Sequence, residues 1–372
     1  MATTSDDHLV HIVELEERAD ALGDGAVKIA ILEEAVRIAD LHHDTKTAYA
    51  ARQKLVRAGT FGGRPDIALV AFSWCVAQAD RDPKTYDETE LLWQYKWVAG
   101  GISNFPNITR EQIDALFADM SMRYERHGST MHAVYQIRRE VAVDMFDRTI
   151  AETAYTRCEQ LKRDDLSNCK ACVLDSLIDY HEFLGDDTTA VEVAKPIVDG
   201  KMSCSKIPQR SYAKVLLPYL RLGKPDRGLK YYKVGYRMIR TSEDFVVTKA
   251  QYITFLALTG NLMRAERLFQ RHFPEAIRAA TPRWRFEFFL AARLFITQLL
   301  AVKGAALLTV PPELRAGGEM LQPATSVAEW LDGQLNELAT AFDTRNGNDG
   351  CKRQIANFKS LGKYAVNCPV DA

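Results

Sequence analysis

Five glycines, each followed five residues later by a small residue, constrain the fold of this chain more than any other feature. The pairs are Gly25/Ala30, Gly63/Ala68, Gly185/Ala190, Gly223/Gly228 and Gly260/Ala265, and their glycines lie 38, 122, 38 and 37 positions apart. A glycine lets the backbone turn sharply where one helix ends, and a small residue lets the next helix approach it closely. The pattern therefore predicts a helical hairpin that recurs along the chain.

Apolar periodicity between these turns predicts where the helices run. Tyr212, Leu216, Tyr219 and Leu220, for example, form the stripe of one helix face. The predicted hairpins span residues 8–41, 44–81, 85–127, 129–163, 170–200, 208–241 and 244–279, followed by a helix at 283–302, an irregular loop at 303–325, a last helix at 326–342 and a polar tail. We expect an all-α protein, an α-solenoid of stacked antiparallel hairpins, because such units bury their apolar faces against neighbours only.

The turn glycine and the small residue, with an aromatic four residues further on at Phe72, Tyr232 and Phe269, resemble the tetratricopeptide-repeat (TPR) superfamily. The resemblance covers roughly residues 8–280 and is closest to the degenerate repeats of bacterial regulatory and adaptor proteins. It implies a TPR-like superhelix whose first helices line a concave groove that receives extended peptides. It also implies a non-enzymatic scaffold or adaptor that binds a protein or peptide.

Charge is distributed very unevenly along the chain. Residues 1–200 hold 22 Lys and Arg against 35 Asp and Glu, whereas residues 201–300 hold 19 against 6. We therefore divide the chain into acidic N-terminal hairpins at 1–165, basic C-terminal hairpins at 166–302, and a loop, capping helix and polar tail at 303–372. The asymmetry indicates either a surface that meets an acidic partner or merely solvated helix faces.

Basic and aromatic residues on the predicted first helices of the basic region are the candidate ligand groove. They are Arg210, Tyr212, Lys214, Tyr219, Lys249 and Tyr252. The aromatic members are more consistent with core packing than with a platform for a ligand. Arg227, Lys230, Lys233, Arg237 and Arg240 belong to a second helix and are expected on the convex side. An alternative function for the basic 201–300 region is a regulator that binds nucleic acid or a nucleotide messenger, although the acidic first 200 residues would repel phosphate.

Three cysteines are candidate metal ligands. Cys169 and Cys172 begin the first helix of one predicted hairpin and Cys204 follows its second helix, so the antiparallel arrangement brings the three sulfurs together. Structural zinc takes four ligands, and Cys158 is the best fourth candidate, ahead of His181. Two other readings remain: ordinary buried thiols and a redox-active CxxC pair. Apart from this possible zinc, no cofactor is expected.

No motif of a known enzyme class occurs. The sequence lacks a phosphate loop, HExxH, GxSxG and GxGxxG, and it predicts no strands to carry a nucleotide-binding fold. The acidic start, Met1 to Asp7, lacks the apolar core of a secretory signal, and no apolar run is long enough for a membrane helix. We expect a cytoplasmic protein with free thiols and no membrane partner.

Overall fold

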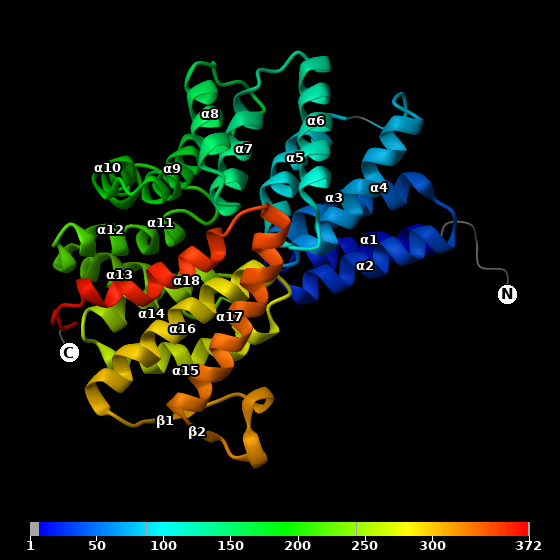
Figure 1. Cartoon of the computed structure of the whole chain (residues 1–372). Coiled ribbons are helices and arrows are strands. Elements are labelled where there is room, and N and C mark those ends of the chain that lie inside the picture. The colour runs from blue at the N-terminus through cyan, green and yellow to red at the C-terminus, as the bar shows by residue number, and fades with distance from the viewer. Residues whose placement is uncertain (1–6, 87, 243, 371–372) are drawn as a thin grey trace.

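The computed structural model describes residues 7–86, 88–242 and 244–370, and it confirms an all-α protein (Figure 1). Residues 1–6, which carry most of the evidence against a signal sequence, lie outside the described residues. The helices are α1 (Asp7–Asp20), α2 (Ala26–Leu41), α3 (Thr45–Phe61), α4 (Pro65–Arg81), α5 (Thr89–Gly101), α6 (Arg110–Arg126), α7 (His132–Asp144), α8 (Arg148–Glu159), α9 (Lys170–Leu184), α10 (Asp187–Val198), α11 (Gln209–Lys214), α12 (Leu216–Arg221), α13 (Pro225–Ile239), α14 (Val246–Leu258), α15 (Leu262–Arg278), α16 (Pro282–Lys303), α17 (Ala324–Asn346) and α18 (Gly350–Ser360), with short 3-10 turns at 102–104, 312–314, 316–318 and 361–364.

The predicted hairpin boundaries agree with these helices to within a few residues. Gly185, Gly223 and Gly260 have φ angles of +80°, +70° and +75°, the left-handed region in which a helix can be ended by glycine. Aspartates begin several following helices: the side chain of Asp186, for example, accepts a hydrogen bond from the Thr189 amide. Neighbouring helices pack in pairs, such as α3 with α4, α7 with α8 and α9 with α10.

The C-terminal segment is more ordered than the sequence predicts. The predicted loop contains a small antiparallel hairpin, β1 (Leu307–Thr309) and β2 (Leu321–Pro323). The last predicted helix, α17, continues to Asn346, and the segment predicted as a polar tail forms α18. Beyond it, the Val366 amide donates to the Leu258 carbonyl oxygen and the Cys368 amide to that of Thr259. Tertiary contacts therefore order a segment whose local pattern is weakly apolar.

Two large hydrophobic clusters form the interior. One extends from Ile12 to Leu166 and is built by α1–α7 with the loop after α8. The other extends from Ile178 to Val370 and includes α17 and α18 together with α9–α16. Residues 303–370 therefore share the core of the helices that precede them.

The end of α17 contacts the N-terminal half of the chain. The Arg345 guanidinium donates to the carbonyl oxygens of Ser103 and Phe105, and Arg110 donates to the carbonyl oxygen of Asn346. Figure 1 shows the α17–α18 connection lying beside α5 and α7, so that segments far apart in sequence meet at the centre of the molecule. Among the described residues, no helix has both the length and the apolar character needed to cross a membrane.

Candidate metal centre and predicted ligand groove

The first turn of α9 presents two cysteines in defined positions. Cys169 is the N-cap of the helix, and its Sγ accepts a hydrogen bond from the Cys172 amide at 3.4 Å. A helix N-terminus has unpaired N–H groups and the positive end of the helix dipole, so it favours a thiolate over a thiol. The CxxC spacing thus places one sulfur on the cap and the other one turn into the helix.

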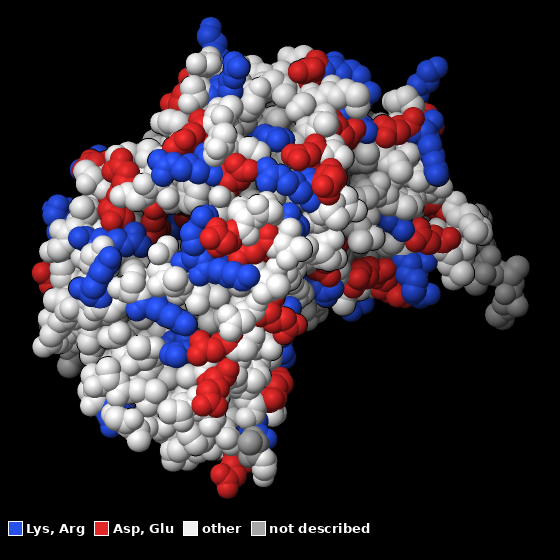
Figure 2. All heavy atoms as spheres, viewed as in Figure 1, with Lys and Arg blue, Asp and Glu red and all other residues white. Residues whose placement is uncertain are grey.

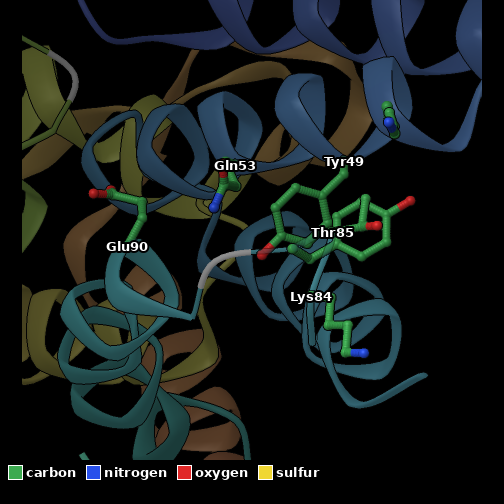
Figure 3. A pocket seen from close by; sticks show the side chains of 7 residues that line it. Tyr49, Gln53, Lys84, Thr85 and Glu90 are labelled. Atoms are coloured by element: carbon green, nitrogen blue, oxygen red, sulfur yellow. The ribbon is translucent and has the colours of Figure 1, made fainter. Parts of the chain in front are cut away.

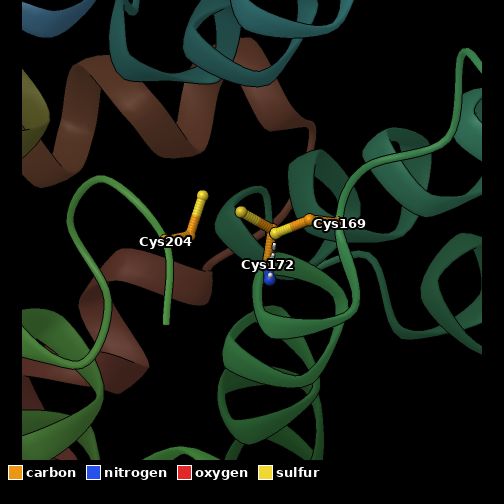
Figure 4. Close-up of side chains that lie close together, drawn as sticks. All are labelled: Cys169, Cys172 and Cys204. Carbon is orange, nitrogen blue, oxygen red and sulfur yellow. Dashed lines mark hydrogen bonds between the residues drawn. The ribbon is translucent and has the colours of Figure 1, made fainter. Parts of the chain in front are cut away.

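The loop between α10 and α11 supplies the third cysteine. Cys204 and Ile207 exchange two backbone hydrogen bonds, of 3.0 and 3.2 Å, which hold this loop in a tight turn. The sulfur atoms of Cys169, Cys172 and Cys204 all lie within 4.8 Å of one another (Figure 4). The three cysteines are therefore close enough to hold a metal ion, as the hairpin topology predicts.

The pKa values of the two thiols of the CxxC motif are shifted in opposite directions. Burial alone would raise the pKa of Cys169, but hydrogen bonds from the Cys172 amide and from the neighbouring thiols lower it below its ordinary value. Burial and the adjacent Cys169 sulfur raise the pKa of Cys172 well above its ordinary value. Cys169 is consequently the first of the pair to become a thiolate, and it is also exposed to solvent.

A buried lysine lies next to this cluster. Lys96 of α5 is 1% exposed; its Nζ donates to the Leu166 carbonyl oxygen at 2.6 Å and lies 3.2 Å from the centre of the Trp93 ring. Burial lowers the pKa of Lys96 to about 8, while Asp164, Cys172 and Cys169 act in the opposite direction. The Lys96 ammonium and the thiols therefore interact electrostatically, and its positive charge favours a thiolate. In the sequence, Lys96 is the single charged residue between Leu91 and Ala99, and this pattern could have indicated that it is buried.

The predicted fourth ligands do not join the cluster. Cys158 is 2% exposed, and its thiol donates to the His132 carbonyl oxygen, with burial raising its pKa to about 11. The His181 ring packs against the rings of Tyr155 and Tyr180, with ring centres 6.1 and 5.2 Å apart. Among the described residues, the group that converges here contains the three cysteines only. Cys158 is thus an ordinary buried thiol.

Three of the six residues predicted to line the ligand groove lie inside the protein. Lys249 is fully buried, where its Nζ contacts Glu275 Oε2 at 2.5 Å and the Ser242 carbonyl oxygen. Tyr252 is also fully buried, and Tyr219 is 3% exposed. The Tyr252 ring packs edge-on against Tyr232, and the Tyr219 ring stacks on Tyr231. These side chains fill the space between hairpins and cannot receive a ligand there.

The other half of the predicted groove, on α11, is paired with acids of α9. Lys214 Nζ lies 2.8 Å from Asp175 and 2.5 Å from Asp179, and Arg210 lies 2.9 Å from Asp175. Tyr212 stacks on Tyr231 at 5.7 Å. The anionic groups that these basic residues bind are thus carboxylates of the same chain.

The same pairing explains part of the uneven charge distribution. Arg221 of α12 contacts Glu182 and Asp187 of the preceding hairpin at 2.9 and 2.8 Å. Acids before residue 200 therefore neutralise bases after it, and Figure 2 shows Lys, Arg, Asp and Glu intermixed over the upper part of the face in view. A basic sequence block does not by itself define a basic surface here.

A pocket of about 580 Å³ lies between α3 and the segment that leads into α5 (Figure 3). The rings of Tyr49 and Tyr86 lie 4.5 Å apart on its wall. Lys46, Lys84 and Glu90 also line it, so its charge is mixed. The pocket is wide open to solvent, and we treat it as a surface hollow.

Comparison with models of protein families finds no match, and comparison with curated proteins finds none either.

Proposed function

We propose that the chain is a non-enzymatic helical scaffold in which Cys169, Cys172 and Cys204 bind one structural zinc ion. The observation that carries the proposal is the convergence of three sulfurs, from two segments about 35 residues apart, to within 4.8 Å of one another. Zinc bound by thiolates at about 2.3 Å in a tetrahedron places its sulfurs about 3.8 Å apart. The sulfurs need to approach one another by no more than about 1 Å to reach that geometry.

Charge balance supports the same ion. Three thiolates around Zn²⁺ give a net charge of −1, and the buried ammonium of Lys96 compensates it from the α5 side. The thiolates also donate enough electron density to make the ion a weak Lewis acid, which favours a structural role over a catalytic one. A fourth donor from a partner would complete the tetrahedron that a structural site requires.

A dithiol redox pair is the second candidate. The lowered pKa of Cys169 at a helix N-cap, next to Cys172, favours attack on a disulfide or an oxidant. Zinc and disulfide formation use the same sulfurs, so they exclude each other and can be measured separately.

The remaining architecture supports the scaffold function. Consecutive helical hairpins with glycine turns are typical of TPR-like α-solenoids, which in the cytoplasm bind protein or peptide partners. Pairing of Arg210 and Lys214 with α9 argues against the groove as the binding site and against nucleic-acid binding there. We therefore propose an adaptor whose partner is an acidic protein or peptide.

Metal analysis of protein purified without chelator tests the zinc site. We expect about one zinc per chain, lost in Cys204→Ser and retained in the matched control Cys75→Ser, because Cys75 is buried in another hairpin. Hydrogen exchange at residues 165–210 should rise when the ion is removed. Wild-type protein that neither contains zinc nor gains stability from it would overturn the proposal. A Cys169–Cys172 disulfide in metal-free protein would favour the redox pair.

A further inference from the structure

Basic residues that are not paired internally collect on the outer face of α13. Arg227, Lys230 and Arg237 are exposed and follow one stripe of this helix. Among pairs of described residues, no ion pair involves these three side chains, in contrast with Lys214 and Arg221. At 1.5 Å per residue the stripe is about 15 Å long between its first and last members.

The outer face of α15 extends this surface. Tyr236 of α13 contacts His272 of α15 through its hydroxyl at 3.1 Å, so the two helices touch through these side chains. The exposed side chains of Arg267 and Arg271 lie on α15, where they continue the positive charge of α13. We call the surface formed by Arg227, Lys230, Arg237, Arg267 and Arg271 the basic face.

Two acids near the basic face are paired with other residues, and a third, the exposed Asp226 next to Arg227, offsets part of the positive charge. Glu275 faces inward and binds Lys249 and His272. Glu266 lies 3.8 Å from Lys303 of α16. The positive charge of the basic face is therefore left to attract a partner of opposite sign.

Apolar side chains among these bases indicate the kind of partner. Val234 and Met238 on α13 are 42% and 48% exposed, and Met263 at the start of α15 is 71% exposed. Single-stranded nucleic acid would instead require exposed aromatic rings for base stacking, but Tyr231 and Tyr232 of α13 are buried. Methionine adapts to varied apolar surfaces and is common where helices are bound. The mixture fits a partner that carries both carboxylates and apolar groups.

We propose that the basic face binds an acidic amphipathic helix of a partner protein. Its carboxylates meet Arg227, Lys230 and Arg237, and its apolar side chains lie on Val234 and Met238. This inference rests on the proposed scaffold function and assigns its partner to the outer surface of α13 and α15.

Binding of a defined probe tests the assignment. The probe is a fluorescent 18-residue peptide with glutamates along one helical face and leucines beside them. The triple variant Arg227→Glu, Lys230→Glu, Arg237→Glu should lower its affinity at least tenfold. The matched control reverses the same charge at exposed positions on three other helices, Arg18→Glu, Arg157→Glu and Lys359→Glu, and should change affinity less than twofold. Val234→Ser with Met238→Ser, which leaves the charges in place, should weaken binding about three- to tenfold.

A measurement on the unaltered protein removes dependence on the folding of any variant. A photo-crosslinker on the peptide should attach within α13 or α15. Attachment elsewhere, equal loss in both triple variants, or no peptide binding would overturn the proposal. Tighter binding of a 20-nucleotide RNA than of the peptide would also overturn it. Zinc content is measured on the same samples, so that zinc-loaded protein without peptide binding rejects this inference alone, and zinc-free protein rejects the metal site.

Discussion

Lys214 of α11 and Asp175 of α9 form an ion pair of 2.8 Å across neighbouring hairpins, although Asp175 is only 1% exposed. The same carboxylate accepts hydrogen bonds from Arg210 and from the Ser211 hydroxyl. Burial acts to raise the pKa of Asp175, but Lys214 and Arg210 outweigh it and hold the pKa below its usual value. One carboxylate thus joins two hairpins through three partners.

Asp175→Ala should lower the free energy of unfolding by about 3 kcal/mol, because it removes the buried acceptor that Lys214, Arg210 and the Ser211 hydroxyl share, while Lys214 keeps Asp179 as a partner. The control is Asp332→Ala, which removes the carboxylate that pairs with Arg293 at a more exposed position. It should lower the free energy of unfolding by about 1 kcal/mol or less. Since the folded-state pKa of Asp175 is depressed, its contribution is complete above the pKa of the unfolded chain, about 3.9, and is lost as pH falls below that value. Urea unfolding of both variants measures the difference, and equal costs would contradict the assignment.

Asp144 should have the opposite pH dependence. Burial raises its pKa to about 6, with Asp179 and Glu140 adding to the effect and Arg283 and the Ser103 hydroxyl opposing it. A raised folded-state pKa means that the carboxyl group destabilises the fold as pH rises from about 4 to 6 and it loses its proton. The free energy of unfolding of Asp144→Asn should therefore rise by about 1–3 kcal/mol relative to that of the wild type between pH 4 and pH 7. A difference that does not change with pH in thermal unfolding would refute this.

Two helical glycines should respond oppositely to alanine. A Cβ at Gly235 in α13 would overlap the Tyr252 hydroxyl and lie 2.8 Å from Tyr212 Cβ, so Gly235→Ala should cost at least about 2 kcal/mol. At Gly333 in α17 nothing lies within 4 Å, and Gly333→Ala should stabilise by about 0.5–1 kcal/mol because alanine favours the helix. Thermal unfolding of the two variants measures both changes in stability. A Gly235 variant as stable as the wild type would show that α13 and α14 are less closely packed than described.

Cysteine alkylation should follow thiolate population and exposure. Cys169, exposed and with its pKa lowered, should react with iodoacetamide at pH 7.5 more than about tenfold faster than Cys75, whose pKa burial raises to about 12. Cys351, with its pKa also raised to about 12, should be similarly slow. Peptide mass spectrometry over time gives the rates. Added zinc should protect Cys169, and protection of Cys75 instead would contradict a metal site at α9.

Local sequence signals located most helices but not the C-terminal segment. Glycine turns carry their own physical requirement, as Gly185 and Gly260 show by their positive φ angles, so they can be recognised without knowing the fold. The segment after residue 342 has one such turn, at Gly347 with a φ angle of +68°, but no apolar pattern that predicts the helix after it. It is ordered by Arg345, Cys351 and Cys368, whose partners lie far away in the sequence and therefore could not be recognised.

The candidate site shows the same division. Cys169, Cys172 and Cys204 could be grouped because the two ends of one hairpin must be adjacent. The buried state of Lys249 and Tyr252 depends on how neighbouring hairpins pack, which no local pattern specifies. Likewise, the bases of α11 looked available only because the sequence does not show that Asp175 faces them.

The contact between Arg345 and the Ser103 carbonyl oxygen spans 242 positions. At a synthesis rate of about 5–20 residues per second, those positions take roughly 12–48 s to translate. During this time the 102–104 turn has been made but its guanidinium partner has not. The first helical hairpins therefore leave the ribosome before the residues of α17 that contact them have been made. The contacts between the two halves of the chain form only after α17 and α18 have been synthesised.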